Sequence, residues 1–317
     1  MSPGQLVRLC RAYDQHRETE PRVLPAHFVR YTSRPASRGS TMARSIFAND
    51  FVTFARADGP RLPITSVVGV ARQFRRALMA HADEPIHAML SGHRPDGSPS
   101  EDPHMAVVPL PVVAGPYPDG ALIGIALVLP RGCAEEARRA VLRAIGRYEQ
   151  AYRDGITDET PGIKLILGSA GDLWLRRVAW SDERATLDPR TWTRASLRWA
   201  TATPIALDRN PGDLHDPDPQ RRNAAIEAAC ATVVDAAHRI GLPPVEVEVF
   251  RSCVLPGTAK PRDYPRFPSN RDRTQRVLVH ARLVFGEPVQ GPVLLGAGRY
   301  HGLGLCLPVD DFKERTR

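Results

Sequence analysis

Two histidines bracket a loop whose composition suits a reactive site. His93 and His104 flank a stretch rich in Gly, Pro, Asp and Glu, and a predicted strand starts at residue 105. Histidine can accept and donate protons at physiological pH, because its ordinary pKa lies near neutrality. Loops on a rigid scaffold are also where catalytic side chains concentrate. We predict proton transfer by His93 and His104; the alternative is that His93 caps a turn and His104 only begins a strand.

A metal site is a second interpretation of the same loop. It would use four side chains, those of His93, Asp96, Glu101 and His104. Their spacing matches none of the standard ligand patterns. We therefore expect neither a metal nor a cofactor.

A glycine-rich segment near the C-terminus is the next candidate. Residues 296–304 read Gly-Ala-Gly-Arg-Tyr-His-Gly-Leu-Gly and lead into an alternating, strand-like stretch, so they do not open a helix as a dinucleotide-binding loop does. Backbone amides without a neighbouring Cβ can approach phosphates, an Arg can pair with them, and an aromatic ring can stack on a base. The predicted contacts are Gly296, Gly298, Arg299, Tyr300, Gly302 and Gly304. His301 is a third catalytic candidate, and a turn that only the fold requires is the alternative.

A basic segment with interleaved aromatic residues precedes that loop. Residues 262–276 contain Tyr264, Phe267 and five arginines, which are Arg262, Arg266, Arg271, Arg273 and Arg276. Basic charge interleaved with aromatic rings is typical of nucleic-acid contacts. A solvated hairpin tip is the alternative.

The overall charge agrees with an anionic partner. The formal net charge is +8 and the pI is about 9.6, and only three of the 43 basic residues are Lys. Arg suits bidentate phosphate contacts, although genomic base composition also raises Arg content. The charge makes a nucleic acid or another polyanion a reasonable partner.

Other features narrow the class of protein. The five cysteines are widely spaced without a CxxC pair, which favours a reducing cytoplasm. The longest apolar stretch, 121–129, is too short to cross a bilayer, and the N-terminus lacks the apolar core of an export signal. No Walker A loop, GxSxG elbow or HExxH motif occurs.

Hydrophobic periodicity predicts the elements that position these candidates. Strands are expected at 51–55, 105–113, 121–129 and 163–167, with helices over 65–78 and 134–152, an order of β-α-β-β-α-β. After a connection, strands at 199–207, 245–249, 277–285 and 303–307 and a helix over 224–240 repeat that order approximately. The predicted fold is α+β, with two tandem ferredoxin-like (βαββαβ) domains. The predicted parts are an N-terminal extension (1–45), a first domain (46–170), a connection (171–198) and a second domain with the Gly-rich loop (199–317).

The chain resembles the RAMP superfamily of CRISPR-associated proteins. The resemblance rests mainly on residues 291–305, which are similar to the Gly-rich loop before the last strand of that superfamily. Residues 90–97, 103–111 and 199–204 extend it to the crRNA-processing, Cas-six-like half of the Csb-type fusion subunit of type I-G (formerly I-U) systems. Most of the Cas-five-like half of that subunit has no counterpart in this chain.

The resemblance implies a cytoplasmic endoribonuclease of antiviral defence. Such enzymes cut precursor crRNA within its repeats without a metal, by attack of a 2'-hydroxyl that leaves a 2',3'-cyclic phosphate. The expected partners are CRISPR repeat RNA and the other subunits of a type I interference complex (Cascade), with no membrane. A non-catalytic subunit that caps the crRNA is the alternative, because catalysis adds only one or two residues to an RNA-binding fold.

Overall fold

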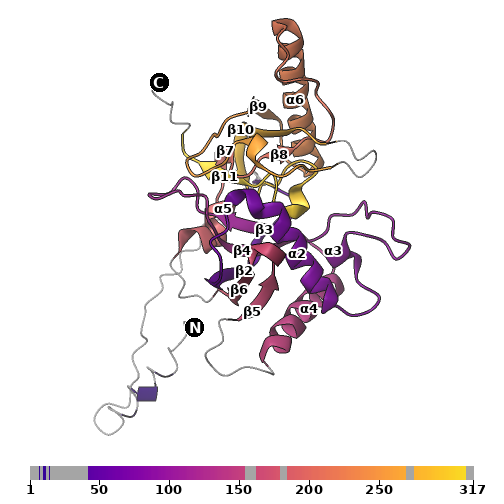
Figure 1. Ribbon diagram of the computed structural model, residues 1–317, viewed down its shortest axis with the longest axis vertical. Helices are drawn as coiled ribbons and strands as arrows, with labels where there is room; N and C mark the ends of the chain where they lie inside the picture. The colour runs from indigo at the N-terminus through magenta and orange to yellow at the C-terminus, as the bar shows by residue number, and fades with distance from the viewer. Residues whose placement is uncertain are drawn as a thin grey trace. The chain divides into compact units, whose positions relative to one another are not determined.

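The computed structural model describes residues 42–153, 162–178, 184–268 and 275–311, together with Val7, Cys10, Arg11 and Asp14. Residues 42–178 and 182–317 group into one compact unit, which contains two β-sheets (Figure 1). Within the described ranges, every helix is too short or too polar to cross a membrane. The fold is mixed α+β, as predicted.

The first sheet has five strands. They are β2 (Phe47–Asp58), β3 (Ala106–Pro111), β4 (Leu122–Pro130), β5 (Ile163–Ile166) and β6 (Asp172–Arg177). Their order is β3-β4-β2-β6-β5, and all neighbours are antiparallel. The first four strands in this order form a split β-α-β arrangement. A helix connects β2 to β3, and β4 lies between these two strands.

The strand beside β2 differs from the one expected. The sequence places the last strand of this half at 163–167, but β5 pairs only with β6 and lies at the sheet edge. The strand that pairs with β2 is β6, which the sequence assigned to the connection. Leu173 and Leu175 of β6 are buried at alternating positions, which explains why this short segment occupies the sheet interior.

Two long helices accompany this sheet. A 3₁₀ turn, η1 (Ile64–Ser66), leads into α2 (Val67–Ala80), and α4 (Glu135–Arg153) follows β4. Helix α2 contacts β3, β5 and α4, so the two helices lie together against the sheet (Figure 1). The predicted apolar face of α2 is confirmed as buried: Val67, Val70, Ala71, Phe74 and Leu78.

The second sheet has six strands. They are β1 (Ala43–Arg44), β7 (Ser196–Thr201), β8 (Ile205–Ala206), β9 (Val245–Phe250), β10 (Leu278–Gln290) and β11 (Cys306–Val309). Strand β10 lies between β9 and β7, and β11 pairs with the other side of β7. The order β9-β10-β7-β11 therefore matches β3-β4-β2-β6 in the first sheet. Strand β1 joins this sheet in parallel with β10, although its residues fall in the range predicted as the extension.

Helix α6 (Pro219–Arg239) supports the second sheet. It begins five residues before the predicted start at 224, because Asp218 caps it by accepting a hydrogen bond from the Gln220 amide at 2.8 Å, with Pro219 at the first helical position. The helix contacts β9, and its buried residues, including Ala229 and Val233, belong to the same hydrophobic cluster as Ala281 of β10. The remaining short elements are α3 (Ala88–Ser91), α5 (Pro189–Thr193), η2 (Gly168–Ala170), η3 (Ala185–Leu187), η4 (Pro261–Asp263) and η5 (Arg299–His301).

The main hydrophobic core draws on both sheets. Phe54 and Leu127 of the first sheet belong to the same buried cluster as Leu303 and Leu305, which lie between η5 and β11. The glycine-rich segment is therefore seated in the core beside the first sheet rather than carried on an open loop. This seating fixes the position of η5.

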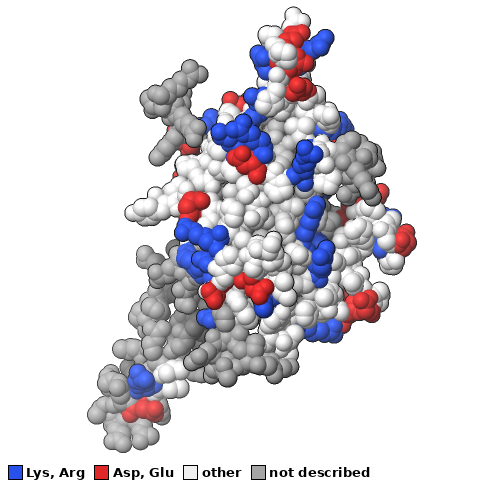
Figure 2. All heavy atoms as spheres, viewed as in Figure 1, with Lys and Arg blue, Asp and Glu red and all other residues white. Residues whose placement is uncertain are grey.

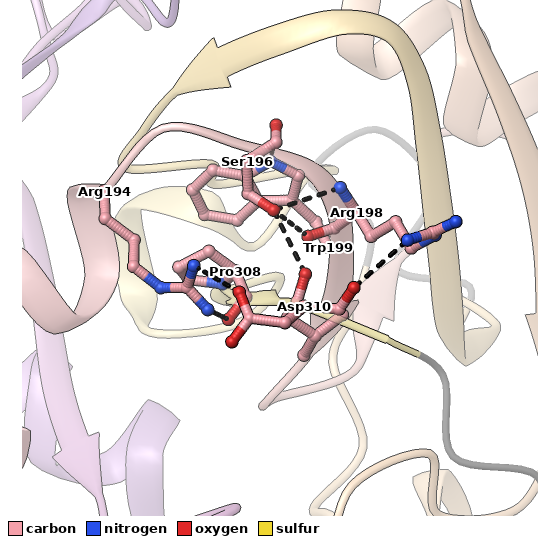
Figure 3. Close-up of polar contacts among 7 residues, drawn as sticks. Arg194, Ser196, Arg198, Trp199, Pro308 and Asp310 are labelled. Atoms are coloured by element: carbon pink, nitrogen blue, oxygen red, sulfur yellow. Dashed lines mark hydrogen bonds and ion pairs between the residues drawn. The ribbon is translucent and has the colours of Figure 1, made fainter.

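The end of β11 is held by side chains from the connection and from β7. Arg194 donates to the Asp310 carboxylate at 2.7 Å and to the Pro308 carbonyl at 3.1 Å, while Arg198 donates to the Asp310 carbonyl at 3.1 Å (Figure 3). The Ser196 hydroxyl donates to the Val309 carbonyl at 3.1 Å. These contacts anchor the strand into which the glycine-rich segment leads.

Candidate active site

Three segments far apart in sequence meet at one place. They are helix α2, the residues before β3, and the turn η5, which contacts both α2 and β3. Two of the predicted catalytic histidines, His104 and His301, lie here with Tyr300 and Arg75. We call His104, Tyr300, His301 and Arg75 the histidine cluster.

Arg75 ties the histidine cluster together from inside helix α2. Its side chain is buried, and its guanidinium donates to the carbonyls of Leu90 at 2.6 Å, Met105 at 2.5 Å and Tyr300 at 3.1 Å. Met105 follows His104, and Tyr300 precedes His301, so one side chain fixes the backbone next to both histidines. Burial lowers the Arg75 pKa to about 10, so the guanidinium remains charged at neutral pH.

The charge of Arg75 has no carboxylate partner among the described residues. Three carbonyl dipoles stabilise the guanidinium, but they leave its full positive charge in place. Arg299 is a second cation here, and its guanidinium carbon lies 4.6 Å from the Tyr300 ring centroid. The result is a positive potential in a partly dehydrated place, which favours an anion such as a phosphate.

His104 lies against the Tyr300 ring. The two ring centroids are 3.6 Å apart and the planes are inclined by 25°. Burial first, and then the charge of Arg75, lower the His104 pKa from 6.5 to about 4. Its Nδ1 is buried without a hydrogen-bond partner, so the neutral imidazole has an unused polar atom.

His301 lies in a similar environment on η5. Burial first, and then the charges of Arg75 and Arg72, lower its pKa from 6.5 to about 3. Its Nδ1 is also buried and unpaired. Both histidines are therefore neutral at physiological pH, which makes each a proton acceptor rather than a donor.

His93 lies at the exposed edge of the same site. Its Nδ1 is 3.0 Å from the Ser91 carbonyl, the local turn contact that the sequence gave as the alternative role. Gly92, the residue before it, adjoins His104 closely: a Cβ at Gly92 would stand 2.7 Å from His104 Nε2. The loop therefore brings the backbone of His93 next to the buried histidine.

Two of the four side chains considered as metal ligands, Asp96 and Glu101, make other polar contacts. Asp96 accepts hydrogen bonds from the amide and hydroxyl of Ser98, and Glu101 lies 3.8 Å from Arg94. Within the ranges that the structure describes, no three His, Cys, Asp or Glu residues are grouped to hold a metal ion.

The glycines of the glycine-rich segment face the protein's own atoms. Gly296, Gly298, Gly302 and Gly304 are all buried. At Gly304, φ is +71° and a Cβ would stand 1.9 Å from the Leu295 carbonyl oxygen. The space that a side chain would need is filled by backbone, so the fold itself requires this glycine. Direct contact of these glycines with RNA stays a prediction.

The aromatic and basic residues of that segment are partly engaged. Tyr300, predicted to stack on a base, already stacks on His104. Arg299 donates to the Gly296 carbonyl at 3.1 Å. The contact between the Arg299 guanidinium and the Tyr300 ring leaves the arginine beside the histidine cluster, where a phosphate would meet it.

The basic segment lines a separate groove. Arg262, Arg266 and Arg276 border a cavity of about 630 Å³, whereas Arg271 and Arg273 lie outside the described residues. Figure 2 shows Lys and Arg in several separate groups on one face of the molecule, with Asp and Glu beside some of them. The positive charge is therefore divided among local sites.

Sequence reasoning missed Arg75. The spacing nevertheless contains the signal, because Arg75 falls four residues after Ala71 and three before Leu78, both of which are buried. An arginine at a core position of an amphipathic helix must find partners inside the protein.

Comparison with known proteins identifies relatives. A family model described as "CRISPR-associated protein, GSU0054 family" matches residues 29–308. No curated protein sequence matches the chain.

The solved structures that resemble this fold do so remotely. A crystal structure of Cas6b has a TM-score of 0.39 and 10% identity, covering 82% of this chain and 98% of its own. A CRISPR-associated protein Cas6 has a TM-score of 0.37 and 12% identity, covering 82% of this chain and 98% of its own. A Cas6 product complex has a TM-score of 0.38 and 14% identity, covering 82% and 99%.

Proposed function

The chain belongs to the GSU0054 family of CRISPR-associated proteins, and we propose that it is a crRNA-processing endoribonuclease. It cuts precursor crRNA within the repeats, without a metal, and acts as a subunit of a type I interference complex in the cytoplasm. In this proposal the two sheets, with their matching strand orders, are two tandem ferredoxin-like units. The first unit includes β6, which lies within the range 171–198 that the sequence assigned to the connection.

The observation that carries the proposal is the histidine cluster. Two neutral histidines and a buried arginine, which has no carboxylate partner in the described ranges, converge from segments that are far apart in sequence. Cleavage by a neighbouring 2'-hydroxyl needs a proton acceptor and positive charge near the phosphate, and these groups can supply both.

The residues take distinct roles in this reaction. The neutral His104 accepts the proton of the 2'-hydroxyl as the 2'-oxygen attacks phosphorus. The bond from phosphorus to the 5'-oxygen breaks, and His93 at the exposed edge gives that oxygen a proton. Arg75 and Arg299 stabilise the negative charge of the phosphorane-like transition state. The products are a 2',3'-cyclic phosphate and a 5'-hydroxyl.

Binding of the RNA phosphate raises the low pKa of His104, the proposed base. A group with a pKa of about 4 accepts a proton poorly at neutral pH. A bound phosphate brings negative charge next to Arg75 and His104, and so raises the histidine pKa toward the working pH. The free protein and the RNA complex therefore differ in their pH dependence.

A non-catalytic crRNA-capping subunit is the second candidate. The observation that favours it is the partial burial of His104 and His301, in which the Nδ1 atom of each ring is shielded from solvent. The same positive site would then hold a phosphate without cutting the chain.

Incubation of the purified protein with its cognate repeat RNA, with and without EDTA, separates these functions. The nuclease proposal requires cleavage that survives EDTA and leaves a 2',3'-cyclic phosphate. Metal dependence or a 3'-hydroxyl product contradicts the mechanism. Tight binding without cleavage supports the capping subunit.

A further inference from the structure

A groove beside the histidine cluster, lined by part of the basic segment 262–276, takes no part in the proposed cleavage. It encloses about 630 Å³, within the range of about 300–1,000 Å³ that is common for sites of small ligands. Its walls come from residues 212–215, from the segment around η4, and from the start of β10. This volume suits a short stretch of extended chain rather than a folded partner.

Positive charge dominates the lining. Five basic side chains face one acidic residue, Asp213; the basic residues are Arg251, Lys260, Arg262, Arg266 and Arg276. Two of them also build the walls: Arg251 donates to the Leu214 carbonyl at 2.6 Å, and Arg276 donates to the Leu207 carbonyl at 3.0 Å. A surplus of this kind favours a ligand with repeated negative charge.

Arg262 and Arg266 are two of the basic groups that remain available to a ligand. Both are exposed, and Arg262 has only a distant carboxylate, that of Asp263 at 3.9 Å. No ion pair involves Arg266 among the described residues. Each guanidinium can therefore turn toward a phosphate without giving up a strong partner.

The aromatic rings of the groove do not offer stacking surfaces. Tyr264 and Phe267 line it, but each is only 6% exposed. A base needs an open ring face to stack on, as in proteins that bind single strands through their bases. The groove is therefore suited to the backbone phosphates rather than to the bases.

Phe267 connects the groove to the histidine cluster. Its ring centroid is 6.4 Å from that of His301, and the guanidinium carbon of Arg72 lies 5.4 Å from the same ring. The Phe267 ring therefore lines the groove and also adjoins His301, so the two sites are neighbours.

We propose that this groove binds the backbone phosphates of single-stranded RNA that continues from the segment held at the histidine cluster. The proposal rests on the proposed function for the identity of the RNA, and it adds a binding site with no preference for base sequence. Arg262 and Arg266 make the main contacts.

The salt dependence of binding tests this site. The variant Arg262→Ala/Arg266→Ala is compared with Arg139→Ala/Arg176→Ala, which removes two exposed arginines of α4 and β6 and so changes the net charge equally. The probes are fluorescent oligouridylate and oligoadenylate, titrated at several salt concentrations. In single strands each phosphate contact contributes about 0.7 to the slope of log K against log salt.

We expect the groove variant to reduce the magnitude of the slope by about 1.4, with both probes, while the control changes it much less. Equal slopes in the two variants would overturn the groove site. A tenfold or larger preference for one probe that the groove variant abolishes would overturn the phosphate assignment. Thermal melting of both variants checks that the exposed substitutions leave the fold intact.

The result of the groove test can be distinguished from the result of the cleavage test of the proposed function. If wild-type protein cuts repeat RNA but the groove variant binds as the control does, the groove inference fails and the nuclease stands. If wild-type protein cuts no repeat RNA but the slope difference appears, the groove stands and the nuclease fails.

Discussion

The imidazole of His104 stacks on the phenol ring of Tyr300, with centroids 3.6 Å apart, although the two residues lie far apart in the sequence. This contact couples the loop before β3 to the turn η5. It also occupies a face of the Tyr300 ring, which we predicted from the sequence to stack on a nucleic-acid base. Tyr300 therefore acts as a support for His104, and a change in one residue is expected to affect the other.

The first prediction concerns the catalytic histidines. His104→Ala removes the proposed base, and loss of a general base typically costs about 10² to 10⁴ in rate. Single-turnover cleavage of the cognate repeat should therefore slow at least about a hundredfold, with affinity for the repeat retained. His93→Ala, which removes the proposed acid, should slow cleavage in the same range.

Tyr300→Phe is the matched control, because it keeps the ring that supports His104 and removes only the hydroxyl. Its cleavage rate should stay near that of wild type. Full activity of both histidine variants would move the catalytic assignment to His301 and Tyr300.

The second prediction concerns Arg75. Arg75→Met keeps a long apolar side chain but leaves the Leu90, Met105 and Tyr300 carbonyls without their donor. A buried group left unsatisfied costs about 1–3 kcal/mol, so the free energy of unfolding should fall by about 3 kcal/mol or more. Urea denaturation followed by circular dichroism measures this loss.

Arg76→Met is the control for that measurement, since Arg76 is the next residue of α2 and is exposed. It should change the free energy of unfolding by less than about 0.5 kcal/mol. A loss in Arg75→Met as small as that in the control would show that Arg75 does not hold the two segments.

The limits of sequence reasoning are visible in particular elements. The strands and helices with strong periodicity were predicted at nearly their observed positions, as for α2 and β9, although β10 extends five residues beyond its predicted end at 285. Strand β6 was missed because only Leu173 and Leu175 alternate within it, and its place beside β2 depends on long-range pairing. Local pattern carries no information about which strand becomes central.

In the candidate site, too, the sequence identified residues but could not predict their surroundings. His93, His104 and His301 were identified by residue type, but their environments could not be. His280 of β10, in contrast, is fully buried and bonded to Thr201 at 2.8 Å and to the Ala259 carbonyl at 2.9 Å. Burial of these side chains comes from elements far away in the sequence, and therefore depends on the complete fold.

The third prediction concerns Gly304. Gly304→Ala places a Cβ 1.9 Å from the Leu295 carbonyl oxygen at a φ of +71°. The left-handed conformation costs a non-glycine residue about 1–2 kcal/mol, and the clash adds to this cost. The unfolding free energy should therefore fall by more than about 2 kcal/mol in urea denaturation.

Gly146→Ala should, in contrast, raise the free energy of unfolding. Gly146 lies in α4 with no atom within 4 Å of its added Cβ, so alanine should stabilise the helix by about 0.5–1 kcal/mol. If Gly304→Ala melted like wild type while RNA affinity fell, the segment would serve binding rather than the fold.

The last prediction concerns the pH dependence of stability. The pKa of His104 is lowered from 6.5 in the unfolded chain to about 4 in the folded protein. The unfolded state therefore binds a proton as pH falls below 6.5, whereas the folded state does so only near 4. Stability is full above pH 6.5 and falls across this window, by at most about 1.4 kcal/mol per pH unit for each such histidine.

The variant His104→Phe isolates this contribution, because it keeps an aromatic ring against Tyr300 but cannot titrate. His301 continues to titrate in the variant, since burial lowers its pKa to about 3. The stability of His104→Phe should therefore decline less steeply than that of wild type between pH 6.5 and about 4. Carboxylates also titrate at the acidic end of this window, but their contribution is common to wild type and His104→Phe and cancels in the difference between the two profiles. Urea denaturation at both ends of the window measures the difference, with the exposed His93→Ala as control. Parallel pH profiles for wild type and His104→Phe would show that His104 is not held neutral by the fold.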